Sequence, residues 1–294
     1  MISPEESRLL LQHIIQSSTS QEYWGIWRVN DYQEDKNTLY EVIYDPQYGF
    51  GWRSLDDVNH FIVGDGTYRF IFDSKMKVIS AVYPGFDLPF LPMGKENIDL
   101  FISNYVIDLQ GNVVVVVSRE NGSTVKSFEF DQDESLLRQT FYSPDGKIIK
   151  EGEFVYRDKD PDEQQIGDML EMMRKVYEEK GSLTDTSIDN RTVMIPQLLP
   201  PGYVLRRSYL VQGEQGEMSQ LIYSDGVSFF SVFQNIYPLS SETQGLSKRM
   251  EIRKEGELTT LAGERRGYRV VVVGSLEPDV LNEIFNSISP DGGR

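Results

Sequence analysis

Apolar and polar residues alternate along most of the chain, in short runs rich in aromatic and β-branched residues that end at turns of Gly, Pro, Asn or Asp. This alternation is typical of antiparallel strands with one buried face. It predicts about ten strands before residue 157, more than a flat sheet carries without curling, so we expect a strongly bent sheet or an incomplete barrel. The predicted strands are Tyr23–Tyr32, Thr38–Tyr44, Phe50–Ser54, His60–Val63, Tyr68–Phe72, Val78–Tyr83, Val106–Leu109, Val113–Ser118, Val125–Phe130, Leu136–Tyr142 and Ile148–Tyr156.

Before residue 182, three segments depart from this alternation and have the spacing of helices. The first, Pro4–Ser18, follows a capping hydroxyl at Ser3 and carries a carboxylate at Glu6, as a capped helix start does. Asn97–Tyr105 places its apolar side chains on one helical face. Asp160–Gly181 begins with a cap and a proline. Its methionines are expected to fill the core, and an adaptable binding surface is the alternative.

The segment Pro84–Gly94 fits neither pattern, because it holds three prolines and two glycines. We expect a loop at the mouth of the bent sheet. Its apolar side chains either plug the end of the sheet or form a lid over a lipid cavity. The candidate lid residues are Phe86, Leu88, Phe90 and Leu91.

A second unit begins at Pro200-Pro201-Gly202, where two residues that cannot donate to a sheet precede a glycine that turns freely. Strands and a final helix from Pro278 are predicted after it. The fold class is therefore α+β: an N-terminal half-open antiparallel β-barrel with covering helices in residues 1–181, a linker in 182–197, and a smaller antiparallel sheet domain with a C-terminal helix in 198–294. The strands of this second domain are Val204–Val211, Met218–Tyr223, Val227–Phe233 and Val270–Val273.

Composition narrows the classes of protein that this fold can serve. Apolar residues make up 39% of the 294 positions, which is a normal globular level. The 29 basic and 46 acidic residues give a formal charge of −17. This charge repels phosphate backbones and anionic membrane surfaces, so we expect no nucleic-acid partner. The chain has no cysteine, which removes disulfides, thiolate catalysis and cysteine metal sites.

The pattern of apolar runs also bears on location. No run approaches the roughly 20 apolar residues that span a bilayer, and Met1 is followed by a helix start rather than by a signal sequence. Two alternatives remain open at this point: the protein is cytosolic, or an export signal has been removed.

Residues able to do chemistry are sparse. His13 in the first predicted helix and His60 in a strand would each need distant partners for a metal site or a base. There is no phosphate-binding glycine loop, zinc-protease motif or nucleophile turn, and the acidic clusters Asp56-Asp57 and Asp158–Glu163 lack the spacing of a calcium loop. We expect a protein that is not an enzyme, with no cofactor and no metal. An enzyme with an unrecognised site is the remaining alternative.

Two surfaces are candidates for binding. Alternation in the aromatic-rich strands predicts a barrel interior lined by aromatic side chains. The last third carries the most basic run of the chain, which is either an edge strand guarded by charge or a docking patch. The candidate lining residues are Trp24, Trp27, Tyr40, Phe50, Trp52, Phe61, Phe70 and Phe72. The candidate docking residues are Arg249, Arg253, Arg265 and Arg266.

The block Leu198–Phe233 resembles a known domain. Its Leu-Pro-Pro-Gly-Tyr opening and its Tyr-Ser-Asp-Gly-Val-Ser-Phe-Phe-Ser-Val-Phe core are similar to the C-terminal domain of the MucB/RseB family of periplasmic sigma-factor regulators. The resemblance continues through Ala262-Gly263 and Arg269–Gly274 into the last helix, in the same order and at similar spacing.

The first half of the chain resembles the lipoprotein-carrier (LolA/LolB-like) fold, which the N-terminal domain of MucB/RseB proteins shares. The matching segments are Tyr23-Trp24-Gly25, Asn97–Tyr105 and Glu153–Tyr156. The acidic, aromatic-rich region Val29–Phe50 departs from the family pattern, which puts any shared lipid contacts in doubt.

The resemblance implies an exported regulatory binding protein. Such a protein would bind the extracytoplasmic part of a membrane anti-sigma factor, shield it from proteolysis, and sense envelope stress or lipidated ligands. The implied location is periplasmic or otherwise extracytoplasmic, with the signal sequence absent from this chain. The alternative of a different class is a carrier that holds lipid or lipoprotein acyl chains in the N-terminal barrel.

Overall fold

The structure is a computed structural model of the 294-residue chain. It describes residues 1–19, 21–56, 61–64, 69–72, 78–82, 98–179, 193–213, 216–238, 251–255 and 258–290. The chain forms two compact units, Met1–Glu178 (unit 1) and Glu179–Arg294 (unit 2). The domain boundaries at residues 181 and 198 stay a prediction, and each unit is described by itself.

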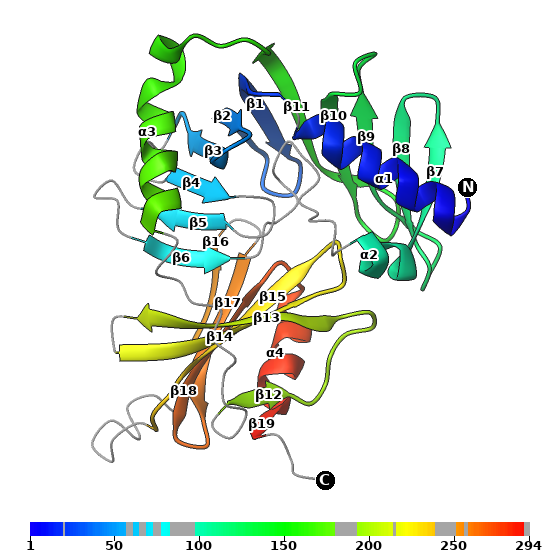
Figure 1. Ribbon diagram of the computed structural model, residues 1–294. Coiled ribbons are helices and arrows are strands. Elements are labelled where there is room, and N and C mark those ends of the chain that lie inside the picture. Colours follow the sequence, from blue (N-terminus) through cyan, green and yellow to red (C-terminus); the bar gives the residue numbers. More distant parts are fainter. Residues whose placement is uncertain are drawn as a thin grey trace. The chain divides into compact units, whose positions relative to one another are not determined.

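Unit 1 is built on one eleven-stranded sheet in which neighbouring strands are antiparallel (Figure 1). The strand order is β6-β5-β4-β3-β2-β1-β11-β10-β9-β8-β7, so the described strands form an open sheet with edges at β6 and β7. This confirms the half-open antiparallel architecture. The strands are β1 (Tyr23–Asp31), β2 (Lys36–Asp45), β3 (Gly49–Ser54), β4 (Phe61–Gly64), β5 (Arg69–Phe72), β6 (Val78–Val82), β7 (Tyr105–Gln110), β8 (Val113–Ser118), β9 (Thr124–Phe130), β10 (Leu136–Tyr142) and β11 (Ile148–Asp158).

The strand register separates the side chains of this sheet onto two faces. In β1, buried and half-buried residues alternate from Tyr23 onward, because successive side chains of a strand point to opposite sides. Trp27 lies opposite Tyr40 in β2 and Phe154 in β11, and we call this side the Trp27 face. Trp24 lies opposite Ile43 in β2, and we call its side the Trp24 face.

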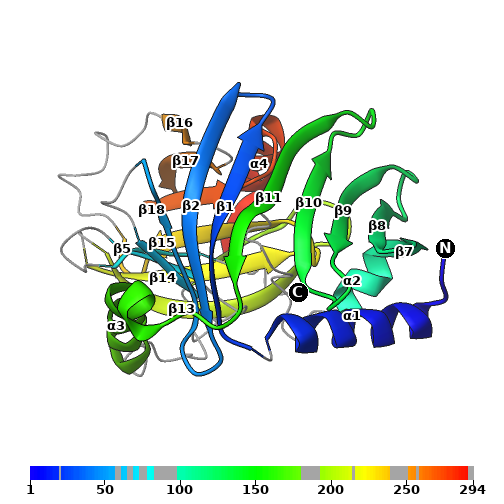
Figure 2. The ribbon, with the colours of Figure 1, turned by 90° about the horizontal axis from the view of Figure 1, so that it is seen from above.

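Helices α1 (Pro4–Ser18) and α2 (Ile98–Asn104) lie beside strands β7–β10 (Figures 1 and 2). Helix α1 begins at the predicted capping box: the Glu6 backbone N–H donates to Ser3 Oγ over 3.3 Å, and the Ser3 N–H donates to the Glu6 carboxylate over 2.8 Å. Just beyond its last turn, the Thr19 carbonyl accepts a 2.9 Å hydrogen bond from the hydroxyl of Tyr44. Since Tyr44 lies opposite Tyr23 in the sheet, this bond ties the end of α1 to the Trp27 face.

Helix α3 (Glu163–Glu179) packs on the Trp24 face. One buried cluster joins it to the sheet and contains Ile43, Phe61, Val63, Ile166, Met169 and Met173. The methionines therefore fill a core, as expected from their helical spacing. Gly51 permits the close approach, because a Cβ added there would lie 2.6 Å from Met173 Sδ and 2.8 Å from Ile43 Cγ2.

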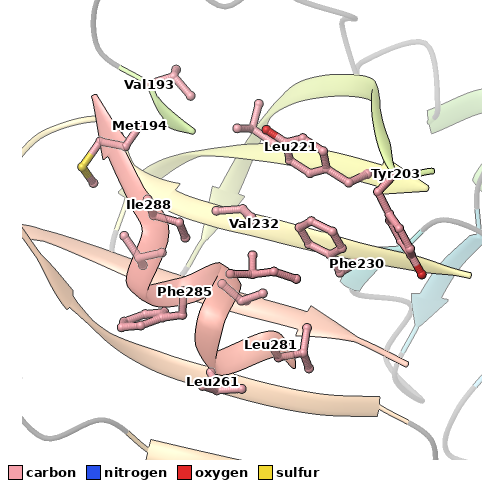
Figure 3. Close-up of a cluster of buried hydrophobic side chains, with 14 residues drawn as sticks. Val193, Met194, Tyr203, Leu221, Phe230, Val232, Leu261, Leu281, Phe285 and Ile288 are labelled. Atoms are coloured by element: carbon pink, nitrogen blue, oxygen red, sulfur yellow. The ribbon is translucent and has the colours of Figure 1, made fainter. Parts of the chain in front are cut away.

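Unit 2 consists of a six-stranded antiparallel sheet, a short two-stranded ribbon and one helix, in its described residues. The strand order of the sheet is β13-β14-β15-β18-β17-β16. Helix α4 (Pro278–Ser287) buries Leu281, Ile284 and Phe285 against one face of the sheet, where Phe230, Val232 and Leu261 complete the core (Figure 3). The strands are β12 (Met194–Pro196), β13 (Val204–Gly213), β14 (Gly216–Ser224), β15 (Phe229–Asn235), β16 (Glu251–Glu255), β17 (Leu258–Arg265), β18 (Tyr268–Gly274) and β19 (Ile288–Pro290).

The α+β fold class is thus confirmed, with local corrections. Strand β15 begins at Phe229 rather than at Val227, because Asp225 Oδ1 accepts the backbone N–H groups of Val227 and Ser228 and holds them in a turn. The described part of the basic run forms edge strand β16. The loop Pro84–Gly94, with its four candidate lid residues, lies outside the described residues. Among the described residues, no helix combines the length and apolar content needed to cross a membrane.

Candidate functional site

The eight candidate lining residues do not share one face of the sheet. Trp24 and Phe61 pack with helix α3 on the Trp24 face. The Trp27 face instead carries Trp27, Tyr40, Phe50 and Trp52. Phe70 and Phe72 occupy β5 and lie opposite Val63 and Phe61 in the register. The structure therefore does not bring all eight to one face, and a ligand-binding role for either group stays a prediction.

On the Trp27 face, the indole of Trp27 fits against a strand that has no side chain at the point of contact. Gly152 in β11 sits opposite Val29, and a Cβ added to it would lie 2.7 Å from Trp27 Cε2 and 2.8 Å from Nε1. The Phe154 ring meets the same indole edge-on, with ring centroids 4.8 Å apart. Trp27 is fully buried as a result.

Two indole N–H groups on the Trp27 face lack an acceptor among the described residues. They belong to Trp27 and Trp52, whose side chains are 0% and 4% exposed. A buried donor without an acceptor costs about 1–3 kcal/mol. The two buried indoles are therefore candidate donors for a carbonyl or carboxylate oxygen on the Trp27 face.

A buried polar group lies further along the same face. Lys126 in β9 is 1% exposed, and its Nζ lies 4.1 Å from the ring centroid of Phe141 and 4.9 Å from that of Phe128. Gln139, also buried, stands opposite Phe128 and next to Gly152 in the register. Sequence reasoning missed both residues, because lysine and glutamine are rarely buried and no local motif marks them.

The Trp24 face carries a ladder of charges across four neighbouring strands. Arg28, Glu153, Arg138 and Glu129 stand opposite one another in the register. Arg28 donates to Glu153, and Arg138 Nη2 lies 3.1 Å from the same carboxylate. The hydrogen bond from Arg28 is the main cause that lowers the pKa of Glu153 from its usual value. The ion pairs neutralise Glu153 from both sides, although Arg28 Nε has no hydrogen-bond partner among the described residues.

Trp24 itself is held in a second polar contact on this face. Its Nε1 donates to Glu41 over 2.9 Å, and Arg53 Nε donates to the other oxygen of that carboxylate over 2.6 Å. Unlike Trp27, Trp24 therefore has a satisfied indole and is part of the structural core under α3.

The candidate docking arginines are not gathered at one place. Arg253 in β16 pairs with Glu251 at 3.4 Å and stands opposite Thr260 in β17. Arg265 is at the far end of β17, about 17 Å further along the strand. It lies over the Phe285 ring and donates to the Asn286 carbonyl. Arg266 occupies the following turn at φ 51° and is exposed, and Arg249 lies outside the described residues.

The histidines do not form a chemical site in the described residues. His13 pairs with Glu134 and links α1 to the turn between β9 and β10. His60 lies outside the described residues. In the parts of the chain that the structure describes, no three His, Cys, Asp or Glu side chains are arranged to hold a metal ion.

These features define a class: a two-unit α+β protein in which an open antiparallel sheet carrying helices precedes a smaller sheet with one helix. Solved structures show the same fold. The MucA/MucB complex of Pseudomonas aeruginosa matches with a TM-score of 0.63 and 17% identity, over 98% of this chain and 100% of that one. MucB in complex with MucA(peri) matches with a TM-score of 0.61 and 16% identity, over 99% and 100%. MucB alone matches with a TM-score of 0.54 and 15% identity, over 98% of each chain.

The chain therefore has the fold of MucB along nearly its whole length, and the resemblance inferred from the sequence is confirmed at the level of the fold. By sequence, no family model matches the chain, and no curated protein matches it.

Proposed function

We propose that this protein is an extracytoplasmic regulatory binding protein that binds the periplasmic part of a membrane anti-sigma factor and shields it from proteolysis. The observation that carries the proposal is the match to MucB over both units, in structures where MucB is bound to MucA.

The test uses the full chain and the extracytoplasmic domain of the source organism's anti-sigma factor, purified as a fluorescently labelled fragment. We expect saturable binding, and slower cleavage of the fragment by a nonspecific protease when the protein is present. An unrelated acidic protein of similar charge serves as the control for nonspecific protection. If the fragment is cleaved at the same rate with and without the protein, and shows no binding, the proposal is wrong.

A second candidate function is binding of an acyl chain on the Trp27 face of unit 1. The observation that favours it is the pair of indole donors on Trp27 and Trp52, which have no acceptor in the described part of the chain and are set among aromatic rings. An ester or carboxylate oxygen would accept these N–H groups while the chain covers the rings. Regulation by a lipidated ligand would then combine both functions in one protein.

Titration with a fluorescent long-chain fatty acid tests this second function. We expect Trp27→Phe and Trp52→Phe, which keep an aromatic ring but remove the N–H, to weaken binding several-fold. Trp24→Phe is the matched control, because its indole already donates to Glu41 on the other face. Equal affinities of all three variants and the wild type for the fatty acid would show that the two indole donors do not contribute to binding.

A further inference from the structure

The edge strands of the two sheets differ in how they are protected. An exposed edge offers unpaired backbone groups to any extended chain, so proteins guard edges with charge, bulges or covering segments. Edge strand β7 is covered, because the Ile2 N–H donates to the Ile107 carbonyl over 3.0 Å and the N-terminal amine pairs with Asp108. Edge strand β16 has the sequence Glu-Ile-Arg-Lys-Glu and is guarded by charge.

Strand β13 is the long edge of unit 2 and begins with exposed apolar side chains. It runs for ten residues, and Val204 and Leu205 at its start are 40% and 49% exposed. Leu198 and Leu199 precede it and are 63% and 40% exposed. Neither pair is charged, and the arginines and the bulge of β13 come only after Leu205.

A fixed turn separates these two pairs. The Tyr203 N–H donates to the Pro200 carbonyl over 3.2 Å, and the Tyr203 side chain is buried in the core, with its ring centroid 5.6 Å from that of Phe230. Burial raises the pKa of the Tyr203 hydroxyl well above its usual value, as expected for an anchored ring. The turn between the two pairs is therefore anchored to the core of unit 2. We call Leu198, Leu199, Val204 and Leu205 the apolar edge.

We propose that an extended segment of the anti-sigma-type partner adds to unit 2 as a further strand along β13 and covers the apolar edge. The inference rests on the proposed function and says where on this protein the partner binds. In such strand addition, main-chain hydrogen bonds supply affinity, and alternate side chains of the added strand supply specificity. The added segment would place apolar side chains against Val204 and Leu205.

Charge favours a different protein over a second copy of this chain as the added strand. Arg206 is the extra residue of a bulge between Leu205 and Arg207, so two arginines follow the apolar edge directly. Two copies pairing through β13 would bring four arginines onto one short ribbon, and like charges opposite one another destabilise strand pairs. A partner segment with one or more carboxylates beyond its apolar residues meets the same arginines favourably.

The direct test compares Leu205→Glu with Ile252→Glu in the full chain, by binding of the labelled anti-sigma fragment. The two residues are matched: both are exposed, at 49% and 53%, both are on edge strands, and they stand opposite the core residues Tyr223 and Leu261. We expect Leu205→Glu to weaken binding by roughly tenfold or more, as for loss of an anchoring apolar contact. Ile252→Glu should bind as the wild type does. Circular dichroism and thermal unfolding confirm that both variants fold.

Other results would overturn the inference. If Leu205→Glu binds with wild-type affinity, the apolar edge is not part of the contact. If both variants bind equally weakly, the added negative charge acts in a general way and not through β13. A wild-type dimer that Leu205→Glu dissociates would make a second copy the occupant. If the wild type itself does not bind the fragment, the proposed function and this inference are both overturned. This outcome differs from failure of the inference alone, in which the wild type binds and Leu205→Glu binds equally well.

A second measurement locates the added strand without relying on lost affinity. The chain has no cysteine, so a single introduced thiol can carry a photo-cross-linker at a chosen place. We expect Ser208→Cys, in the middle of β13, to cross-link to the fragment, and Arg253→Cys, on β16, not to do so. Cross-linking from β16 alone would overturn the inference.

Discussion

The indole of Trp27 packs against Gly152, which has no side chain. The indole occupies the space that a Cβ at Gly152 would need. We expect Gly152→Ala to destabilise the protein by about 1–3 kcal/mol, the usual cost of overpacking a core. Urea unfolding followed by tryptophan fluorescence measures the loss.

Gly167→Ala is the matched control for this substitution. Gly167 is exposed in helix α3, and nothing lies within 4 Å of the position that its Cβ would take. Alanine at this helical position should stabilise the protein by up to about 1 kcal/mol. Equal stability of Gly152→Ala and the wild type would show that Trp27 does not lie against β11.

Glu153 gives the charge ladder a defined pH dependence. Its pKa is lowered in the folded state, chiefly by the hydrogen bond from Arg28, relative to an ordinary value of 4.5. A lowered pKa means that the carboxylate stabilises the fold above pH 4.5, and that this contribution is lost as the pH falls through the folded-state value. We expect Glu153→Gln to be less stable than the wild type at pH 7, by about 1–3 kcal/mol.

The difference between Glu153→Gln and the wild type should shrink as the pH is lowered from 5 to 3. Urea midpoints at several pH values measure it. Glu120→Gln, an exposed substitution in the turn between β8 and β9, is the control for removing a carboxylate. A stability gap for Glu153→Gln that stays constant with pH would contradict the assigned pKa direction.

Single residues also show how far the sequence can predict the candidate site. Trp24 and Trp27 are three positions apart in one strand, and an odd separation sends two side chains to opposite faces. The predicted lining grouped both residues because both are aromatic. The alternation of side chains along a strand would have placed them on opposite faces. The burial of Lys126 was not predictable in this way, because it depends on Phe141 across a hairpin whose register shifts between Leu136 and Arg138.

At the scale of elements, local turns were predictable and long-range pairings were not. Gly111, Gly122 and Gly146 adopt positive φ angles in the hairpin turns that their sequence context predicts. The pairing of β1 with β11 joins segments separated by more than a hundred residues, with no local signal in either. The same holds for α3, whose methionine spacing predicts burial but does not specify the Trp24 face.

The close packing of α3 on the sheet depends on Gly51, because Met173 occupies the space that a side chain at Gly51 would need. We expect Gly51→Ala to push the helix away from the sheet and to speed hydrogen exchange throughout residues 163–179, while exchange in α2 stays unchanged. Mass-spectrometric hydrogen exchange on the folded variant measures both regions. Uniform acceleration over the whole of unit 1 would indicate global destabilisation instead of a displaced helix.

At the scale of the whole molecule, the acidic charge is distributed unevenly. Residues Met1–Glu178 hold 17 basic and 31 acidic side chains, for a net −14, whereas Glu179–Arg294 holds 12 and 15, for a net −3. Long-range attraction of a basic partner would therefore come mainly from unit 1 and weaken with salt. Unit 2 is close to neutral, so contacts with it depend more on shape and apolar burial.

Unit 2 has a core drawn from its own residues, which run from Val193 to Ile288. We therefore expect the fragment 193–294 to fold alone. Circular dichroism should show sheet structure, and urea should unfold it in one cooperative transition. A fragment without a cooperative transition would mean that unit 2 depends on the rest of the chain for its stability.

The open edges of the eleven-stranded sheet have a mechanical consequence. A closed barrel has a radius that is fixed by its strand number and stagger, so it widens only by breaking hydrogen bonds. In the described strands of unit 1, the end strands β6 and β7 do not pair with each other, and small changes of twist between neighbouring strands can alter the curvature while the ladders stay intact. The curvature of this sheet can therefore change at a low cost in free energy. The packing of side chains such as Trp27 and Met173 then favours one curvature over others.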